Sequence, residues 1–335
     1  MIVNPIAGKD IRRLTTAASH TSDSAKIEAV RRTVIAAVES GAERVLLSPD
    51  PHCLAERAVA GFALPVEMLD IHLRGHRRDT TDAAEAMWKE GAGVIVALGG
   101  DGTCRDVAKG WPDATLIAIS TGTNNVYPMS IDATAAGAAA GFVACGAVRP
   151  DAVVRRSKKV CVEIDTGDGV TNDLALVDLA LIDAQFVGAR AILDPGSIRL
   201  IVAAIATPAS TGLSSIAGRL LPVDRWQPGG VLVRLGGNER HLRAPLSPGA
   251  FSTVQVQETR CLANGESASF AGPGILAFDG ERDLRISGTT NVSVKIDLTG
   301  PQLVDVSATL MLAAQQGLFE ARAPHVSTPE EHHGH

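Results

Sequence analysis

Three glycines enclose a single carboxylate in Gly99-Gly100-Asp101-Gly102-Thr103, directly after the apolar segment 94–98. Glycines let a backbone approach a bulky group closely, and their bare N–H groups form a cradle for an anion such as phosphate. A nearby phosphate raises the pKa of a carboxylate, which makes it a better general base for a hydroxyl. We therefore expect the glycines to bind phosphate and Asp101 to be catalytic, with a simple helix N-cap at Asp101 or Thr103 as the alternative.

Two further polar loops follow predicted strands. One is Ser120-Thr121-Gly122-Thr123-Asn124-Asn125, and the other is Asn4-Pro5-Ile6-Ala7-Gly8-Lys9-Asp10 after the first strand. Because parallel strands end at one edge of a sheet, we expect these loops to share a site with Asp101. Ordinary turns are the alternative, and the earlier loop lacks P-loop spacing. The phosphate- or nucleotide-binding candidates in these loops are Asn4, Gly8, Lys9, Thr121, Gly122, Thr123, Asn124 and Asn125.

Two other polar clusters occur later in the chain. Phe278-Asp279-Gly280-Glu281-Arg282 lies between two predicted strands, and by spacing alone its Asp-Gly pair favours a hairpin turn. The basic residues 155–159 are interpreted as a solvated hairpin face rather than a phosphate clamp.

The elements that must position these residues alternate between strand and helix over roughly the first 130 residues. One helix is expected over 26–40, capped within 22–24, and another before Gly91, capped within 79–81. Such β-α-β repeats form a parallel sheet. Later apolar runs, including one strand over 174–182, alternate with polar residues and turns, which indicates an antiparallel β domain.

Composition narrows the class of protein. The 335 residues carry a net charge of −6 and only 3% aromatic side chains, so a nucleic-acid surface is not expected. The five cysteines lack paired spacing, and no leader pattern precedes the first strand, which favours a cytoplasmic protein. The uncharged stretch 200–218 is broken by Pro208, so no membrane segment is expected.

Taken together, these motifs resemble the superfamily of NAD kinases, diacylglycerol kinases and sphingosine kinases. Residues 4–13, 122–126 and 186–190 are similar to its ATP-NAD kinase-like branch, which includes the acetoin-catabolism X protein. The resemblance implies an α/β fold: a Rossmann-like parallel-sheet domain over 1–128, then an antiparallel β-sandwich-like domain over 129–300. It also implies that 301–322 returns to the first domain, and we expect 323–335 to be a flexible tail.

The resemblance also assigns roles to residues. It implies that Asp101 lies at the acceptor hydroxyl, that Gly100, Gly102 and Thr103 hold donor phosphates, and that Asn124 meets the nucleotide. Acceptor-binding candidates are Asp178, Asp279 and Glu281.

Two acceptor motifs depart from the pattern of NAD kinases. NAD kinases typically bind the dinucleotide with an Asn-Glu or Asn-Asp pair in a strand. In the nearest match here Val177 stands in place of the asparagine, while the earlier pair Asn172-Asp173 is expected at a turn. The segment 207–214 lacks the tyrosine of the corresponding family motif.

The predicted activity is a Mg²⁺-dependent transfer of phosphate from ATP to an alcohol, with no metal site built from the protein's own residues. NAD is the leading acceptor, so the expected partner is a small molecule. A polyol or other small hydroxylated metabolite comes second and a lipid third. A nucleotide-binding regulator without catalysis is the alternative class. By resemblance the chain is expected to form a homo-oligomer.

Overall fold

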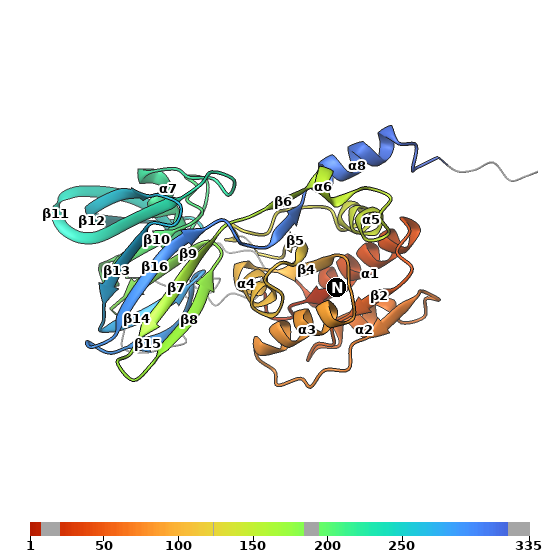
Figure 1. Ribbon diagram of the computed structural model, residues 1–335, viewed down its shortest axis with the longest axis horizontal. Helices are drawn as coiled ribbons and strands as arrows, with labels where there is room; N and C mark the ends of the chain where they lie inside the picture. The colour runs from red at the N-terminus through yellow and green to blue at the C-terminus, as the bar shows by residue number, and fades with distance from the viewer. Residues whose placement is uncertain (8–20, 123, 184–193, 321–335) are drawn as a thin grey trace, which may run out of the picture.

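The computed structural model describes residues 1–7, 21–122, 124–183 and 194–320. The chain forms two lobes side by side, an α/β domain and an all-β domain (Figure 1). Of the predicted site residues, Gly8, Lys9 and Thr123 lie outside the described part of the chain, as do 186–190 and the tail 323–335.

The first domain is built on a five-stranded sheet in the order β1-β4-β5-β17-β6. All its strand pairs are parallel except β17 with β6. The small parallel pair β2-β3 continues from β1, because the Ser48 N–H donates to the Met1 carbonyl at 3.0 Å. The strands are β1 (Ile2–Val3), β2 (Val45–Leu47), β3 (Val66–Met68), β4 (Ile95–Gly99), β5 (Thr115–Ser120), β6 (Val154–Arg156) and β17 (Gln302–Val304).

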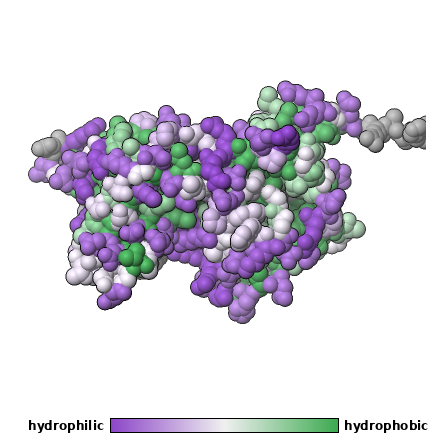
Figure 2. All heavy atoms as spheres, in the orientation of Figure 1, coloured by the Kyte–Doolittle hydropathy of each residue, from purple (hydrophilic) through white to green (hydrophobic). Residues whose placement is uncertain are grey.

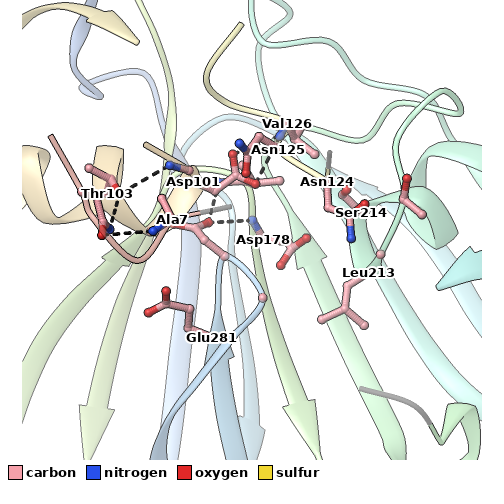
Figure 3. A pocket seen from close by; sticks show the side chains of 18 of the residues that line it. Ala7, Asp101, Thr103, Asn124, Asn125, Val126, Asp178, Leu213, Ser214 and Glu281 are labelled. Atoms are coloured by element: carbon pink, nitrogen blue, oxygen red, sulfur yellow. Dashed lines mark hydrogen bonds between the residues drawn. The ribbon is translucent and has the colours of Figure 1, made fainter. Parts of the chain in front are cut away.

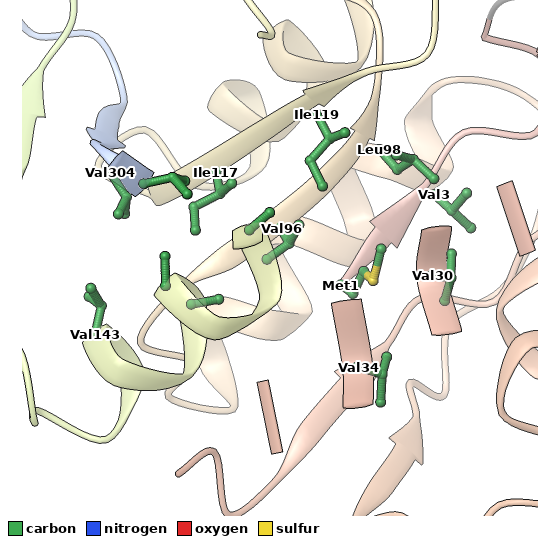
Figure 4. Close-up of a cluster of buried hydrophobic side chains, with 14 of the residues drawn as sticks. Met1, Val3, Val30, Val34, Val96, Leu98, Ile117, Ile119, Val143 and Val304 are labelled. Carbon is green, nitrogen blue, oxygen red and sulfur yellow. The ribbon is translucent and has the colours of Figure 1, made fainter. Parts of the chain in front are cut away.

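Helices cover both faces of this sheet because successive strand residues point to opposite sides. Val96, Leu98 and Ile117 pack with α1 and α5, as Figure 4 shows, whereas Ile95, Ala97 and Leu116 pack with α3 and α4. The helices of this domain are α1 (Asp23–Glu39), α2 (Leu54–Val59), α3 (Arg78–Lys89), α4 (Asp101–Gly110), α5 (Ala133–Ala144), α6 (Pro150–Val153) and α8 (Val306–Gln315), whereas α7 (Leu213–Leu220) packs on the second domain.

Two predicted caps have different outcomes. Ser22 caps α1 by accepting the Ala25 N–H, as expected. The cap expected within 79–81 is wrong, since α3 begins at Arg78 without a side-chain cap. Asp79 instead accepts the N–H groups of Arg74 and Gly75, which closes the preceding loop.

The second domain packs a six-stranded sheet, β12-β11-β10-β9-β14-β15, against a four-stranded sheet, β13-β16-β7-β8. Leu181, Leu232, Val162 and Val294 form part of the core between them. The remaining elements are β7 (Lys159–Asp165), β8 (Val170–Ala175), β9 (Asp178–Ile182), the 3-10 helix η2 (Pro195–Ser197), β10 (Ile198–Ala203), β11 (Gly230–Ser247), β12 (Ala250–Leu262), β13 (Ser267–Ala271), β14 (Gly274–Phe278), β15 (Glu281–Ile286) and β16 (Asn291–Asp297).

Three expectations for this half of the chain are corrected. The single strand over 174–182 is interrupted at Leu176 and Val177, where the chain passes from one sheet to the other. Asn172 and Asp173 lie within strand β8, not at a turn. Lys158 is buried rather than solvated, and its ammonium group donates to two carbonyls of the loop before β11.

The chain joins the first sheet again after the sandwich, since β17 pairs with β5 and β6. Helix α5 packs against α1, so the segment from α5 to β6 also belongs with the first sheet. The boundary expected near residue 128 therefore falls short of the point where the chain enters the sandwich.

Surface and helix properties follow from this arrangement. Hydrophilic residues outline both lobes on the face in Figure 2, and hydrophobic atoms show around α8, where Met311 and Phe319 are exposed. No helix in the described ranges combines the length and apolar character that a bilayer crossing requires.

Candidate active site

A cleft of about 180 Å³ opens between the two domains. The first domain contributes the loop after β1, the N-terminus of α4 and the loop after β5. The second domain contributes the β8–β9 link, the start of α7 and the β14–β15 turn. The cleft thus lies at the carboxyl ends of β1, β4 and β5, where open parallel sheets bind ligands.

Asp101 is the first residue of α4 and lies in the middle of this cleft, with Thr103 on one side and Ser214 on the other (Figure 3). Its carboxylate accepts the Val126 N–H at 3.0 Å and the Tyr127 N–H at 2.8 Å. Burial raises the pKa of Asp101 to about 7, and the charge of Asp279 adds to this rise. The two N–H groups and Arg225 act in the opposite direction.

The three glycines around Asp101 leave room for close neighbours. A Cβ at Gly99 would lie 2.4 Å from Thr103 Oγ1, and one at Gly100 would lie 2.9 Å from Asn125 Oδ1. A Cβ at Gly102 would lie 2.8 Å from Glu281 Oε1. These glycines therefore let side chains from other segments converge on the first turn of α4.

The loop after β1 is tied to the same turn. Asn4 donates from its side-chain amide to Thr103 Oγ1 at 2.8 Å, while its Oδ1 accepts the N–H groups of Ile6 and Ala7. The buried Lys26 donates to the carbonyls of Asn4 and Pro5. A lysine on the face of α1 thus holds the loop, and nothing in its spacing within the sequence signals this role.

The loop after β5 contributes only in part to the cleft. Asn124, Asn125 and Val126 line it, whereas Thr121 and Gly122 do not. Asn125 donates to Ser120 Oγ at 2.8 Å, which holds its amide beside Gly100. Thr121 is buried, and its carbonyl accepts from Thr21 near α1.

The β14–β15 turn is a hairpin, as its spacing predicts, and it also contributes to the site. Asp279 and Gly280 have positive φ angles of 51° and 79°. The Asp279 carboxylate accepts the N–H groups of Leu176, Val177 and Asp178, at 2.8 Å for Val177. Burial raises the pKa of Asp279 to about 6, although Arg105 and these N–H groups oppose the rise.

Asp178 faces the cleft from the start of β9 and is 4% exposed. Its Oδ1 has no hydrogen-bond partner within the described residues. Burial raises the pKa of Asp178 well above its usual range, and the charges of Asp279 and Asp101 raise it further. We infer that the three aspartates hold at least one proton at neutral pH, because like charges at one site disfavour joint ionisation.

Glu281 lies over Gly102 and forms an ion pair with Arg77 at 2.7 Å, which joins the two domains across the mouth of the cleft. Both side chains are about two-fifths exposed, so this pair contributes little to stability.

Among the described residues, no group of three or more His, Cys, Asp or Glu side chains is arranged to hold a metal ion. Burial and Asp101 raise the pKa of the Cys104 thiol, which disfavours a thiolate nucleophile there.

Sequence reasoning missed Arg225, which reaches from the second domain to the loop that holds Asp101. It donates to the carbonyls of Val126 at 2.7 Å and Tyr127 at 2.9 Å. It lies in a loop between α7 and β11 with no recognisable motif around it, so only the packing of the two domains reveals the contact.

Two family models match the chain. The ATP-NAD kinase N-terminal domain matches residues 10–147, and the acetoin catabolism protein X C-terminal domain matches residues 158–299. Acetoin catabolism protein X of Cupriavidus necator is 34% identical over 335 residues, which covers 96% of this chain and 93% of that protein. The chain belongs to the acetoin catabolism protein X family.

The fold of this acetoin catabolism protein X family member is similar to that of a solved kinase. Yeast NADH kinase complexed with NADH superposes with a TM-score of 0.53 and 15% identity, covering 89% of this chain and 85% of that chain. The predicted fold class and family resemblance are therefore confirmed, and the family is kinase-like.

Proposed function

We propose that the protein transfers the γ-phosphoryl group of ATP to a hydroxyl of a small molecule, with Asp101 as the general base. The observation that carries this proposal is the state of Asp101. Its carboxylate is fixed by two N–H groups in an interdomain cleft, and burial raises its pKa to about 7. A base with a pKa near the working pH is the most effective one for proton transfer from a hydroxyl.

In this mechanism the acceptor hydroxyl gives its proton to Asp101 while its oxygen bonds to the γ-phosphorus. The bond from that phosphorus to the β–γ bridging oxygen breaks, and ADP leaves with the electron pair. The first turn of α4 would hold the donor phosphates through its free N–H groups, because Gly100 and Gly102 leave its backbone open. Asn4, Thr103, Asn124 and Asn125 border that position.

Mg²⁺ suits this site as a partner of ATP rather than as a resident ion. The cleft has an excess of acidic side chains, and the described residues offer no three-ligand cluster. The ion would therefore be held mainly by phosphate oxygens and water, where it would offset the charge of the donor. The protein's own residues position the reactants and accept the proton.

NAD is the leading acceptor because the chain matches the ATP-NAD kinase N-terminal domain and shares the fold of yeast NADH kinase. Asp178, Asp279 and Glu281 line the cleft and would contact the acceptor in this proposal. One observation favours a different small hydroxylated metabolite, such as a polyol. Val177 stands where NAD kinases have an amide, and its side chain is buried and cannot hydrogen-bond a ligand. A lipid ranks third, and a regulator that binds nucleotide without turnover is the alternative class.

The test is to incubate the purified protein with ATP and Mg²⁺ and follow ADP release with each of NAD, NADH, nucleosides, polyols and diacylglycerol. Polyphosphate replaces ATP in a parallel series. We expect one small hydroxylated acceptor to stimulate ADP release in wild type but not in Asp101→Asn. If nucleotide raises the melting temperature while no acceptor stimulates turnover, the regulator is favoured instead. Light scattering of the same sample tests the proposed homo-oligomer.

A further inference from the structure

We propose that Arg225 is a positioning residue for Asp101, which fixes from the second domain the two peptide groups that hold the Asp101 carboxylate and favours the ionised form of that carboxylate. The proposal rests on the proposed role of Asp101 as the base. Arg225 does not itself line the cleft. It acts through the opposite side of the Val126–Tyr127 segment.

The hydrogen bonds form a continuous path. The two guanidinium nitrogens donate to the carbonyls of Val126 and Tyr127, at 2.7 and 2.9 Å. The N–H groups of the same two residues donate to the Asp101 carboxylate, at 3.0 and 2.8 Å. A planar guanidinium group that donates to both carbonyls restricts rotation of these two peptide groups. A lysine ammonium group in its place would not restrict them in this way. The direction of both N–H groups therefore depends on Arg225.

Both ends of this path are anchored. Tyr127 is fully buried, and its hydroxyl bonds Ser157 Oγ at 2.7 Å. On the other side, the Asp224 carboxylate accepts the N–H groups of Trp226 and Gln227, while Arg155 of β6 stacks over the Trp226 ring at 4.2 Å. The loop that carries Arg225 is thus held against the first domain, and the guanidinium group is not a loose surface charge.

Arg225 also carries a positive charge that lowers the pKa of Asp101. The charges of Asp279 and Arg225 change the pKa of Asp101, and the charge of Asp101 in turn raises the pKa of Asp178 and of Cys104. Burial is the main reason that the pKa of Asp101 is raised, Asp279 raises it further, and Arg225 lowers it. Removal of this positive charge should raise the pKa of Asp101 further, so that less of the base is ionised at neutral pH.

The chain contains a single tyrosine, Tyr127, so ¹⁵N-tyrosine labelling gives one backbone amide signal. This amide donates to Asp101, and its shift therefore reports the ionisation of Asp101 without any need for turnover. In wild type we expect a titration midpoint near 7, and Asp101→Asn should abolish the titration. Arg225→Gln should raise the midpoint by about one pH unit, because it removes an opposite charge.

Two companion variants complete the experiment. Arg225→Lys keeps the charge but lacks the planar guanidinium group, so its midpoint should rise by less than that of Arg225→Gln, and it remains informative if Arg225→Gln does not fold. Arg234→Gln removes an arginine that pairs with Glu258 in the same domain and should change nothing. An unchanged midpoint in folded Arg225→Gln, or in Arg225→Lys, would overturn the proposal.

Turnover then separates this proposal from the proposed function. Given the expected rise in midpoint, Arg225→Gln should lose about fivefold in kcat at pH 7 and recover almost fully at pH 9, with KM for ATP unchanged. A purely structural role would lower the rate equally at both pH values and so contradicts the proposal. If the midpoint moves as expected while wild type shows no turnover, the proposed function fails and the role of Arg225 in holding Asp101 stands.

Discussion

Replacing Asp101 with asparagine should remove turnover and at the same time stabilise the fold at neutral and alkaline pH. Asparagine keeps one carbonyl oxygen that can accept the N–H groups of Val126 and Tyr127, but it cannot accept a proton. It also carries no charge, so the cost of ionising a buried carboxylate beside Asp279 disappears. Catalysis and stability thus make opposite demands on this position.

The size of the gain follows from the pKa of Asp101, which burial raises from 3.8 to about 7. A pKa raised in the folded state means that stability is fully present below pH 3.8 and is lost as the pH rises toward 7. About three pH units correspond to about 4 kcal/mol above pH 7. Weaker hydrogen bonds to the neutral amide, and partial access of water from the cleft, should reduce the net gain to about 2 kcal/mol.

Urea unfolding of wild type and Asp101→Asn at pH 5 and pH 8 measures this difference. The gain should be small at pH 5 and largest at pH 8, because only the wild type has to ionise Asp101 between these values. Asp151→Asn, which changes an exposed carboxylate paired with Arg149, should give no gain at either pH. An equal gain at both pH values, or substrate-dependent ADP release by Asp101→Asn, would refute the reasoning.

Two further variants test other parts of the site. Gly100→Ala should lower the affinity for ATP in calorimetric titration by about tenfold or more and change stability by less than about 1 kcal/mol, since the new Cβ displaces only the end of Asn125 from Ser120 but narrows the cradle. Unchanged ATP binding argues against phosphates at this turn. Arg105→Met should destabilise the protein by about 2–4 kcal/mol in urea unfolding, because the buried guanidinium donates to Asp173 across the domain boundary. A loss below about 1 kcal/mol speaks against this contact as a main link between the domains.

The first domain and its site were largely predictable because their signals are local. The apolar strand before Gly99, the glycines and the later polar loop each follow from a few consecutive residues, and parallel strands bring such loops to one edge. The hairpin at Asp279 was also readable from its Asp-Gly pair. That its carboxylate would bind the N–H groups of the β8–β9 link was not, since this contact joins residues about a hundred positions apart.

Cations that bind backbone carbonyls were the main feature that the sequence could not reveal. The buried Lys26 and Lys158 and the half-buried Arg225 all donate to backbone carbonyls of other loops, and pattern analysis assigns charged residues to the solvent by default. The position of each depends on where two domains or two loops meet. The interruption of the strand at Val177 also depends on a contact between distant segments, because the Asp279 carboxylate of the β14–β15 hairpin accepts the Val177 N–H.

The position of β17 affects how the protein folds during synthesis. Residues 302–304 lie between β5 and β6, so the first sheet contains a gap until almost the whole chain has been made. Until then the edge of β5 offers unpaired N–H and carbonyl groups, and such edges invite pairing with other chains. The α/β domain is encoded mostly at the start of the chain, yet its completion must wait for the sandwich to emerge. A chain that stops just before residue 302 should therefore aggregate rather than yield two independent domains.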